Sequence, residues 1–251
     1  MTEGRRKIAR AFAGAREYDR HALVQRRVAE SLADRIAALP LPPSPRVLEI
    51  GCGTGFLTEA LLARGIGGEW LVTDIAPEMV DRCRERLGEK PGRRFAVLDG
   101  ERGVVTEGSF DLICSSLALQ WFDDGPAALR RMAGWLAPGG HCLVSTLGPG
   151  SFAEWRAAHA AEGLSAGTPS FVPVAAFSAL DPEALIVENV IERHVDARAF
   201  LRAVKAIGAG TADPAHRPLS PRALRRVMAA FDRNGCEVTY EVVTCHLRRA
   251  R

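Results

Sequence analysis

The sequence has no run of apolar residues near the ~20 that a membrane-spanning helix requires. Its first residues are polar and rich in arginine, and they lack the apolar segment that marks a secretory signal. We therefore expect a protein that does not enter a membrane and that resides in the cytoplasm. The 251 residues, 47% of them hydrophobic and 25% charged, suffice for one globular domain with additions.

Motifs for metals, disulfides and nucleic acid are also missing. The six cysteines are scattered, without a CxxC pair and without a histidine at ligand spacing, so we expect reduced thiols and no metal site. A net charge of +3 gives no reason to expect nucleic acid as a partner. Lysine is scarce, at Lys7, Lys90 and Lys205 among 33 basic residues, so a single arginine carries little functional information here.

The segment 46–57, RVLEIGCGTGFL, is the most informative stretch that is present. An apolar run leads into glycines at every second position, Gly51, Gly53 and Gly55, which predicts a buried strand, a tight loop and a helix. Glycine permits backbone conformations that are closed to other residues, and it lets a ligand approach the backbone closely. We therefore predict a ligand-binding loop at this point.

A second apolar strand, 70–73, ends at Asp74, where a carboxylate is placed to accept hydrogen bonds from both hydroxyls of a ribose. Dinucleotides and S-adenosylmethionine both fit this arrangement. The dinucleotide fingerprint requires a small residue where this chain has Phe56. Glu49, two residues before Gly51, would repel a pyrophosphate and suits the cationic groups of S-adenosylmethionine, so the sequence favours the latter.

Predicted strands and helices alternate along the chain, which indicates an α/β fold with a doubly wound, mostly parallel sheet of seven strands. Ligands of such sheets bind at the carboxyl ends of the strands, and Glu49, Asp74, Asp99 and Ser115–Ser116 all map to that edge. The Pro138-Gly139-Gly140 sequence predicts a turn before the fifth strand. We place that strand at 141–146, the sixth at 184–195 and the last at 238–247, antiparallel at the edge of the sheet.

This pattern divides the chain into four parts. We expect an N-terminal helical lid of two helices at 1–45, a cofactor-binding core at 46–147, a helical cap with one sheet strand at 148–235, and the final strand within 236–251.

Four further segments carry a resemblance to a known family. They are YDRHALVQRRVAESL at 18–32, SSLALQWFDD at 115–124, STLGPGSF at 145–152 and FLRAVKAIGA at 200–209. Together with the ExGxGxG motif, they resemble the malonyl-[acyl-carrier-protein] O-methyltransferases of biotin synthesis, which are class I, Rossmann-like methyltransferases. The resemblance implies methyl transfer from S-adenosylmethionine to the free carboxylate of malonyl-acyl carrier protein, giving an ester that primes pimeloyl synthesis.

The resemblance also assigns roles to individual residues. We expect Asp74 to hold the ribose, Asp99 to accept from the adenine amino group, and Ile75 and Met79 to flank the adenine. The full predicted cofactor site comprises Glu49, Gly51, Gly53, Gly55, Asp74, Ile75, Met79, Asp99, Gly100 and Ser116.

For the acceptor, we expect Gln120 and Trp121 to position the carboxylate through an amide and an indole N–H, with Tyr18 closing the site. His21, in the same lid, is assigned to the docking of the substrate or its carrier. Arg198, Arg202 and Lys205 fall on one face of a predicted helix, where they would receive the acidic carrier protein. The alternative role for Lys205 is to reach the malonyl carboxylate.

Three alternatives stay open from the sequence. They are a methyltransferase acting on another carboxylic acid or small molecule, an NAD-dependent oxidoreductase, and a binding module without catalysis.

Overall fold

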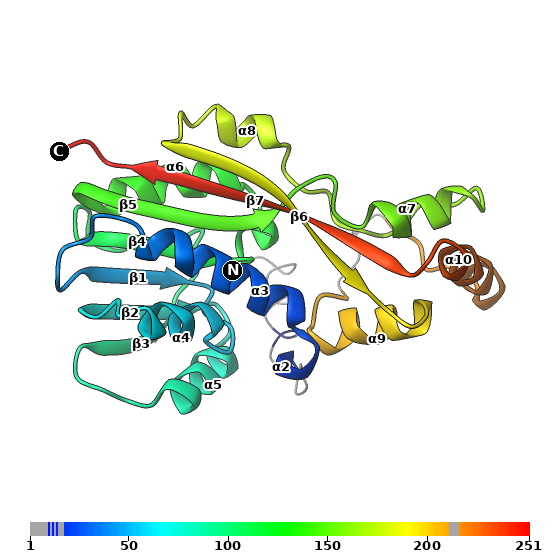
Figure 1. The fold of residues 1–251 in the computed structure, drawn as a ribbon, viewed down its shortest axis with the longest axis horizontal. Helices are drawn as coiled ribbons and strands as arrows, with labels where there is room; N and C mark the ends of the chain where they lie inside the picture. The colour runs from blue at the N-terminus through cyan, green and yellow to red at the C-terminus, as the bar shows by residue number, and fades with distance from the viewer. Residues whose placement is uncertain (1–9, 11, 13, 15–17, 211–215) are drawn as a thin grey trace.

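A computed structural model describes residues 10, 12, 14, 18–210 and 216–251 of the chain. Seven strands form one sheet in the order β3-β2-β1-β4-β5-β7-β6 (Figure 1). The strands are β1 (Arg46–Ile50), β2 (Glu69–Asp74), β3 (Arg93–Val97), β4 (Phe110–Ser116), β5 (Leu136–Leu147), β6 (Ala184–Arg193) and β7 (Glu237–Arg248). The predicted doubly wound, mostly parallel α/β sheet is confirmed.

The position of the last strand was predicted wrongly. Strand β7 is antiparallel to its neighbours, as expected, but it lies between β5 and β6 and is not at the edge of the sheet. Strand β6 forms that edge. The sequence pattern gives the direction and length of a strand, whereas its place in the order depends on partners that are distant in the chain.

The predicted turn at Pro138-Gly139-Gly140 is also wrong. Strand β5 already begins at Leu136, and the three residues form an irregularity within it, where the register to β4 shifts between Phe110 and Leu112. The Gly139 N–H donates to the carbonyl oxygen of Arg249 at 3.0 Å, so the C-terminal end of the chain satisfies the backbone at this point. A positive φ of 81° at Gly139 permits the local bend.

The helices cover both faces of the sheet. They are α2 (Tyr18–His21), α3 (Leu23–Ala37), α4 (Phe56–Ala63), α5 (Pro77–Leu87), α6 (Gly125–Trp135), α7 (Ala153–Ala160), α8 (Val174–Ser178), α9 (Ala197–Ala206) and α10 (Pro221–Arg233), with a 3₁₀ turn at Leu119–Trp121. One apolar core lies between the sheet and helices α3, α4 and α5, and a second between the sheet and helices α6 and α8. A further predicted helix near the N-terminus falls largely outside the described residues.

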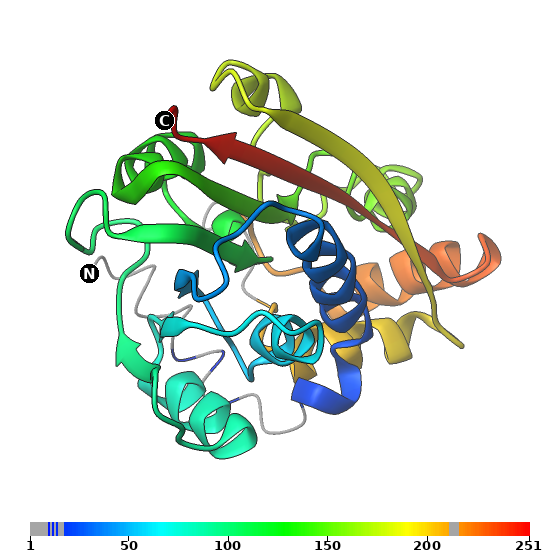
Figure 2. The same cartoon turned by 60° about the vertical axis from the view of Figure 1, so that its left-hand side comes forward.

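Strands β6 and β7 continue beyond the rest of the sheet, so that β6 ends and β7 begins among helices α7, α9 and α10 (Figures 1 and 2). A third apolar core, which includes Trp155, Phe200 and Phe231, joins these helices to the extended strands. Helix α8, in contrast, packs on the face of the sheet through Phe177. The segment predicted as one helical cap is therefore divided between two places, and its proposed boundaries remain a prediction.

All six cysteines are free and buried. No helix among the described residues is long and apolar enough to cross a membrane.

Candidate functional site

The glycine-rich loop between β1 and α4 is compressed between two neighbouring segments. A Cβ atom at Gly51 would lie 2.4 Å from the Cβ atom of Ala118, in the segment after β4, and φ at Gly51 is +73°. A Cβ atom at Gly55 would lie 3.0 Å from the sulfur of Cys83 on α5. Both positions therefore require glycine because the loop packs closely against protein. Gly53, where a Cβ atom would meet only the Tyr18 hydroxyl at 4.0 Å, faces a pocket.

Asp74, at the end of β2, holds this loop in place. Its carboxylate accepts hydrogen bonds from the Gly53 N–H and from the Ala76 N–H, each at 2.9 Å. Burial raises the pKa of Asp74, and the backbone N–H donors offset part of that rise. A carboxylate has about four lone-pair positions, so both oxygens keep acceptor capacity toward the pocket that Asp74 lines.

The first pocket lies at the carboxyl ends of the parallel strands and has a volume of about 730 Å³. The structure brings together here most of the residues predicted to bind a cofactor: Gly51, Gly53, Asp74, Ile75, Met79, Asp99, Gly100 and Ser116. Its remaining lining residues are mainly apolar: Phe12, Tyr18, Ile50, Leu98, Leu117, Ala118, Trp121 and Phe122. The pocket can thus enclose an elongated ligand with an apolar body and a few polar groups.

Asp99 has a structural task in addition to its place in the pocket. Its carboxylate oxygen Oδ1 accepts hydrogen bonds from the N–H groups of Glu101 and Arg102, at 3.0 and 3.1 Å. This is the ordinary turn chemistry of an Asp-Gly sequence. The carboxylate is thereby fixed in orientation at the wall of the pocket.

Glu49 lies behind the first pocket rather than in its wall. The side chain is 1% exposed and accepts a hydrogen bond from the Thr58 hydroxyl of α4. Burial raises the pKa of Glu49 to about 7, and the nearby Asp74 carboxylate adds to the rise. Glu49 therefore acts on the pocket through charge and through the position of α4, without lining it.

A second pocket of about 610 Å³ adjoins the first. The two pockets share Phe12, Tyr18, Leu117 and Trp121. The second pocket is otherwise lined by Gln25, Gln120, Leu147, Phe152, Pro169, Phe171, Val204, Ile207, Ala209 and Tyr240. Among the described lining residues none is charged, so the described donors that an anion would meet here are neutral.

Gln120 is held by two hydrogen bonds at the boundary of the second pocket. Its amide nitrogen donates to the Leu117 carbonyl oxygen at 2.7 Å, and its amide oxygen accepts from the Thr146 hydroxyl at 3.3 Å. Leu117 has a φ of +52°, which a leucine rarely adopts. The bond from Gln120 supports this strained residue at the junction of the pockets and leaves one amide N–H for another acceptor.

Tyr18 and Trp121 form the partition between the pockets. The Phe12 ring contacts both of them edge to face, with centroids 6.5 Å from Tyr18 and 5.4 Å from Trp121. Burial raises the pKa of Tyr18, and the carboxylates of Asp74 and Asp19 raise it further, so its hydroxyl stays protonated as a donor.

Several predicted residues do not reach either pocket. Gly55 packs against α5, and His21 ends α2 without lining a cavity. Arg198, Arg202 and Lys205 are exposed on α9, and Val204 rather than Lys205 lines the second pocket. The structure therefore gives no support for the alternative in which Lys205 holds the acceptor.

Sequence reasoning missed most of the second pocket. Phe152, Phe171 and Tyr240 resemble core residues in any local pattern, and they come from segments far from the glycine motif. Gln25 stands in a polar cluster that was visible in the sequence, but nothing in the sequence indicated which of its residues faces a cavity. The positive φ of Leu117 has no signal in the sequence.

The chain is similar to known methyltransferases. A family model described as "Methyltransferase domain" matches residues 48–144. A malonyl-[acyl-carrier protein] O-methyltransferase of Magnetococcus marinus is 42% identical, over 96% of this chain and 92% of that protein. The biotin biosynthesis bifunctional protein of Bordetella avium is 46% identical, over 98% of this chain. The chain spans only 53% of that bifunctional protein.

Solved structures resemble the fold. An S-adenosylmethionine-dependent methyltransferase from Mesorhizobium loti has a TM-score of 0.52 at 21% identity, covering 88% of this chain and 98% of that one. A phosphoethanolamine N-methyltransferase of Haemonchus contortus, in complex with S-adenosylmethionine, has a TM-score of 0.52 at 16% identity, covering 88% and 52%.

The raised pKa of Glu49 predicts a pH-dependent effect of Glu49→Gln. A carboxyl whose pKa rises on folding stabilises the native state at low pH, and this contribution is lost as the pH rises through about 7. Glutamine keeps the size of the side chain and removes the ionisation. Between pH 5 and 8 we expect the free energy of unfolding of the variant to improve relative to wild type by on the order of 2–3 kcal/mol. Urea unfolding of both proteins at each pH measures this difference in the free energy of unfolding. A difference that stays the same from pH 5 to 8 would contradict the raised pKa of Glu49.

Proposed function

Because the chain belongs to the malonyl-[acyl-carrier protein] O-methyltransferase family, we propose that it methylates the free carboxylate of malonyl-acyl carrier protein. The methyl donor is S-adenosylmethionine. The product ester masks a negative charge, so that the acyl group can be elongated as an apolar primer of pimeloyl synthesis for biotin. The observation that carries this proposal is the pair of pockets that meet at Tyr18 and Trp121, one with carboxylates in its wall and one whose described lining residues are uncharged.

The first pocket suits S-adenosylmethionine, which supplies an activated methyl group when bound. The free lone pairs of Asp74 are available to the ribose hydroxyls, and Gly53 leaves the loop backbone open to the ligand. Ile75 and Met79 offer apolar surfaces for the adenine, with Asp99 at the wall as an acceptor. The Asp74 carboxylate in its wall and the Glu49 carboxylate behind that wall make the first pocket favourable for a cationic ligand.

The second pocket suits the acceptor. A carboxylate is ionised at neutral pH, so no residue of the chain has to remove a proton from it. The chain must exclude water and orient one carboxylate oxygen toward the first pocket, a contribution worth on the order of 7–11 kcal/mol when alignment is complete. Neutral donors such as Gln120 and Trp121 orient the oxygen without pairing its charge with a cation, which would reduce its nucleophilicity.

The uncharged lining also distinguishes a thioester from a free dicarboxylic acid. A dicarboxylic acid would bring a second carboxylate into a pocket whose described residues offer no cation, and burial of an unpaired charge is unfavourable. A malonyl thioester brings one carboxylate, and the remainder of its acyl arm is suited to the apolar walls.

Incubation with labelled S-adenosylmethionine tests the proposal directly. The acceptor panel comprises malonyl, succinyl and glutaryl thioesters on acyl carrier protein and on coenzyme A, together with the three free acids. We expect a base-labile methyl ester on the malonyl thioester and much less on the free acids. Transfer to a free acid alone, or to none of the compounds, would contradict the proposed acceptor.

Gln120→Ala tests the acceptor pocket separately from the cofactor. Loss of the amide removes one neutral hydrogen bond to the carboxylate and the support of Leu117, so we expect kcat to fall by about tenfold. Affinity for S-adenosylhomocysteine, measured by calorimetry, should stay at the wild-type value because Gln120 does not line the first pocket. Gln120→Glu keeps the size of the side chain, and its negative charge should lower kcat further. Wild-type turnover in Gln120→Ala would refute the role.

The carrier protein requires a docking surface outside the pockets, and we assign it to the exposed face of α9. Arg198, Arg202 and Lys205 lie on this face, and none of them is paired within the described part of the chain. Helix α2, which ends at His21, lies against α9, and Val204 of α9 lines the second pocket. A basic surface beside this pocket suits a small acidic carrier, because opposite charges steer its approach.

Charge reversal tests this surface. Arg198→Glu with Arg202→Glu should raise KM for malonyl-acyl carrier protein by roughly tenfold at low salt and leave KM for malonyl-coenzyme A nearly unchanged. The matched control reverses two exposed basic residues near the opposite edge of the sheet, Lys90→Glu with Arg94→Glu. High salt should abolish the difference between wild type and variant. If the α9 double variant raised KM equally for malonyl-acyl carrier protein and malonyl-coenzyme A, the docking site would lie elsewhere. The same conclusion would follow if the control double variant raised KM for malonyl-acyl carrier protein as much as the α9 double variant.

A further inference from the structure

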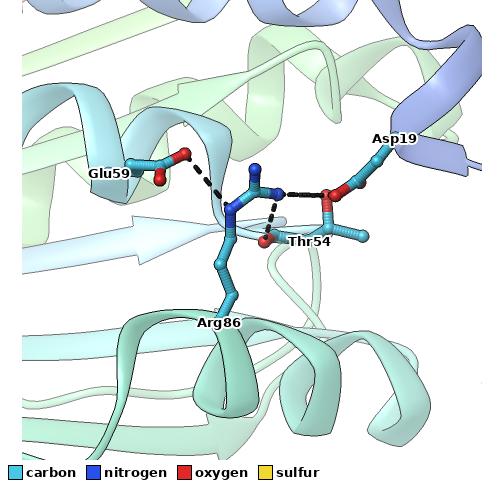
Figure 3. A network of polar contacts seen from close by, with 4 residues as sticks. All are labelled: Asp19, Thr54, Glu59 and Arg86. Carbon is cyan, nitrogen blue, oxygen red and sulfur yellow. Dashed lines mark hydrogen bonds and ion pairs between the residues drawn. The ribbon is translucent and has the colours of Figure 1, made fainter.

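Arg86 of α5 joins three segments that surround the glycine-rich loop (Figure 3). Its guanidinium donates to the Asp19 carboxylate of α2 at 2.8 Å and to the Glu59 carboxylate of α4 at 3.1 Å. It also donates to the carbonyl oxygen of Thr54, within the loop, at 3.3 Å. The Thr54 hydroxyl in turn donates to Asp19 at 2.6 Å. We call these four residues the arginine tie.

The arginine tie reaches the first pocket through the residue that follows Gly53. Thr54 is next to Gly53, whose N–H donates to the Asp74 carboxylate. Asp19 is next to Tyr18, which lines both pockets. The position of α2 above the pockets is therefore linked to the loop that lies below them.

Apolar contacts give the same arrangement a second support. The Phe56 ring lies under the Arg86 guanidinium, 4.8 Å from its centre, and 6.1 Å from the Tyr18 ring. The Tyr18 ring and the Arg86 guanidinium therefore both lie against Phe56 in the arrangement in which Arg86 pairs with Asp19. None of the four residues of α2 is fully buried, although Tyr18 packs partly buried against two apolar clusters. The ion pair from Arg86 therefore adds to limited packing.

We propose that the ion pair between Arg86 and Asp19 holds α2 closed over the junction of the two pockets, which makes Asp19 and Arg86 positioning residues for methyl transfer. The pair keeps Tyr18 between the cofactor and the acceptor, and its opening releases the cofactor product. The proposal rests on the proposed function only in taking S-adenosylmethionine as the occupant of the first pocket.

The chain itself offers a matched pair of variants. The side chains of Asp19 and Glu59 are each 48% exposed, and both pair with Arg86. Asp19→Asn removes the negative charge that pairs α2 with Arg86. The amide oxygen of the new side chain can still accept the hydrogen bond from the Thr54 hydroxyl. Glu59→Gln removes the same charge from Arg86 but leaves the contact with α2 in place. If the loss of any carboxylate partner of Arg86 were enough, both variants would show the effect. If the contact with α2 matters, only Asp19→Asn shows it.

Two measurements report on the closure. Hydrogen exchange of the amides in 18–25 should be about two- to fivefold faster in Asp19→Asn than in wild type, the range expected for a half-exposed ion pair, with Glu59→Gln unchanged. Dissociation of S-adenosylhomocysteine, followed in stopped flow by displacement, should accelerate by a similar factor in Asp19→Asn only. At high salt, wild type should approach the variant because the pair is screened.

Equal behaviour of the two variants, or wild-type exchange in Asp19→Asn, would overturn the proposal. Failure of wild type to bind S-adenosylhomocysteine would instead contradict the proposed cofactor, while the exchange measurement would still test the arginine tie. Circular dichroism melting of each variant checks that the fold is intact.

Discussion

The contact between the Asp74 carboxylate and the glycine-rich loop determines the rest of the site. Two backbone N–H groups direct this carboxylate, at the end of β2, and the loop is pressed from the other side by the segment that follows β4. The loop can follow this path because Gly51 and Gly55 have positive φ angles and lack a Cβ atom. Helix α4 begins from this loop, and α5 and α2 are joined to it through Arg86.

Two buried acids behind the loop make the region costly for the free protein. Asp74 and Glu49 both have raised pKa values because burial disfavours their charged forms. A positively charged ligand in the first pocket would lower the free energy of burying these two carboxylates. Such unfavourable burial of charge is common at binding sites. The described lining of the second pocket is neutral, in contrast, as the proposed binding of a reactive carboxylate would favour. The partition formed by Tyr18 and Trp121 separates these two electrostatic environments.

Much of the core could be predicted from the sequence, because its signals are local. The apolar runs before Gly51 and Asp74 gave strands, the glycine spacing gave the loop, and the carboxyl-edge rule gathered the polar residues at one edge. The order of β6 and β7 and the strand through Pro138 could not be read, because they depend on pairing between distant segments. The acceptor pocket was largely invisible for the same reason. Its aromatic walls look like core, and only the tertiary arrangement exposes them to a cavity.

The place of β7 within the sheet has a consequence for the order in which the protein assembles during synthesis. The described walls of the first pocket come from residues 12–122, so all of them are present on a nascent chain when about half of its length has been made. The second pocket needs Tyr240, which lies on the last strand, and that strand must enter between β5 and β6 before the sheet is continuous. Domains emerge from the ribosome in N-terminal to C-terminal order. The described walls of the first pocket are therefore synthesised before the last strand, which completes the sheet and supplies Tyr240 to the second pocket.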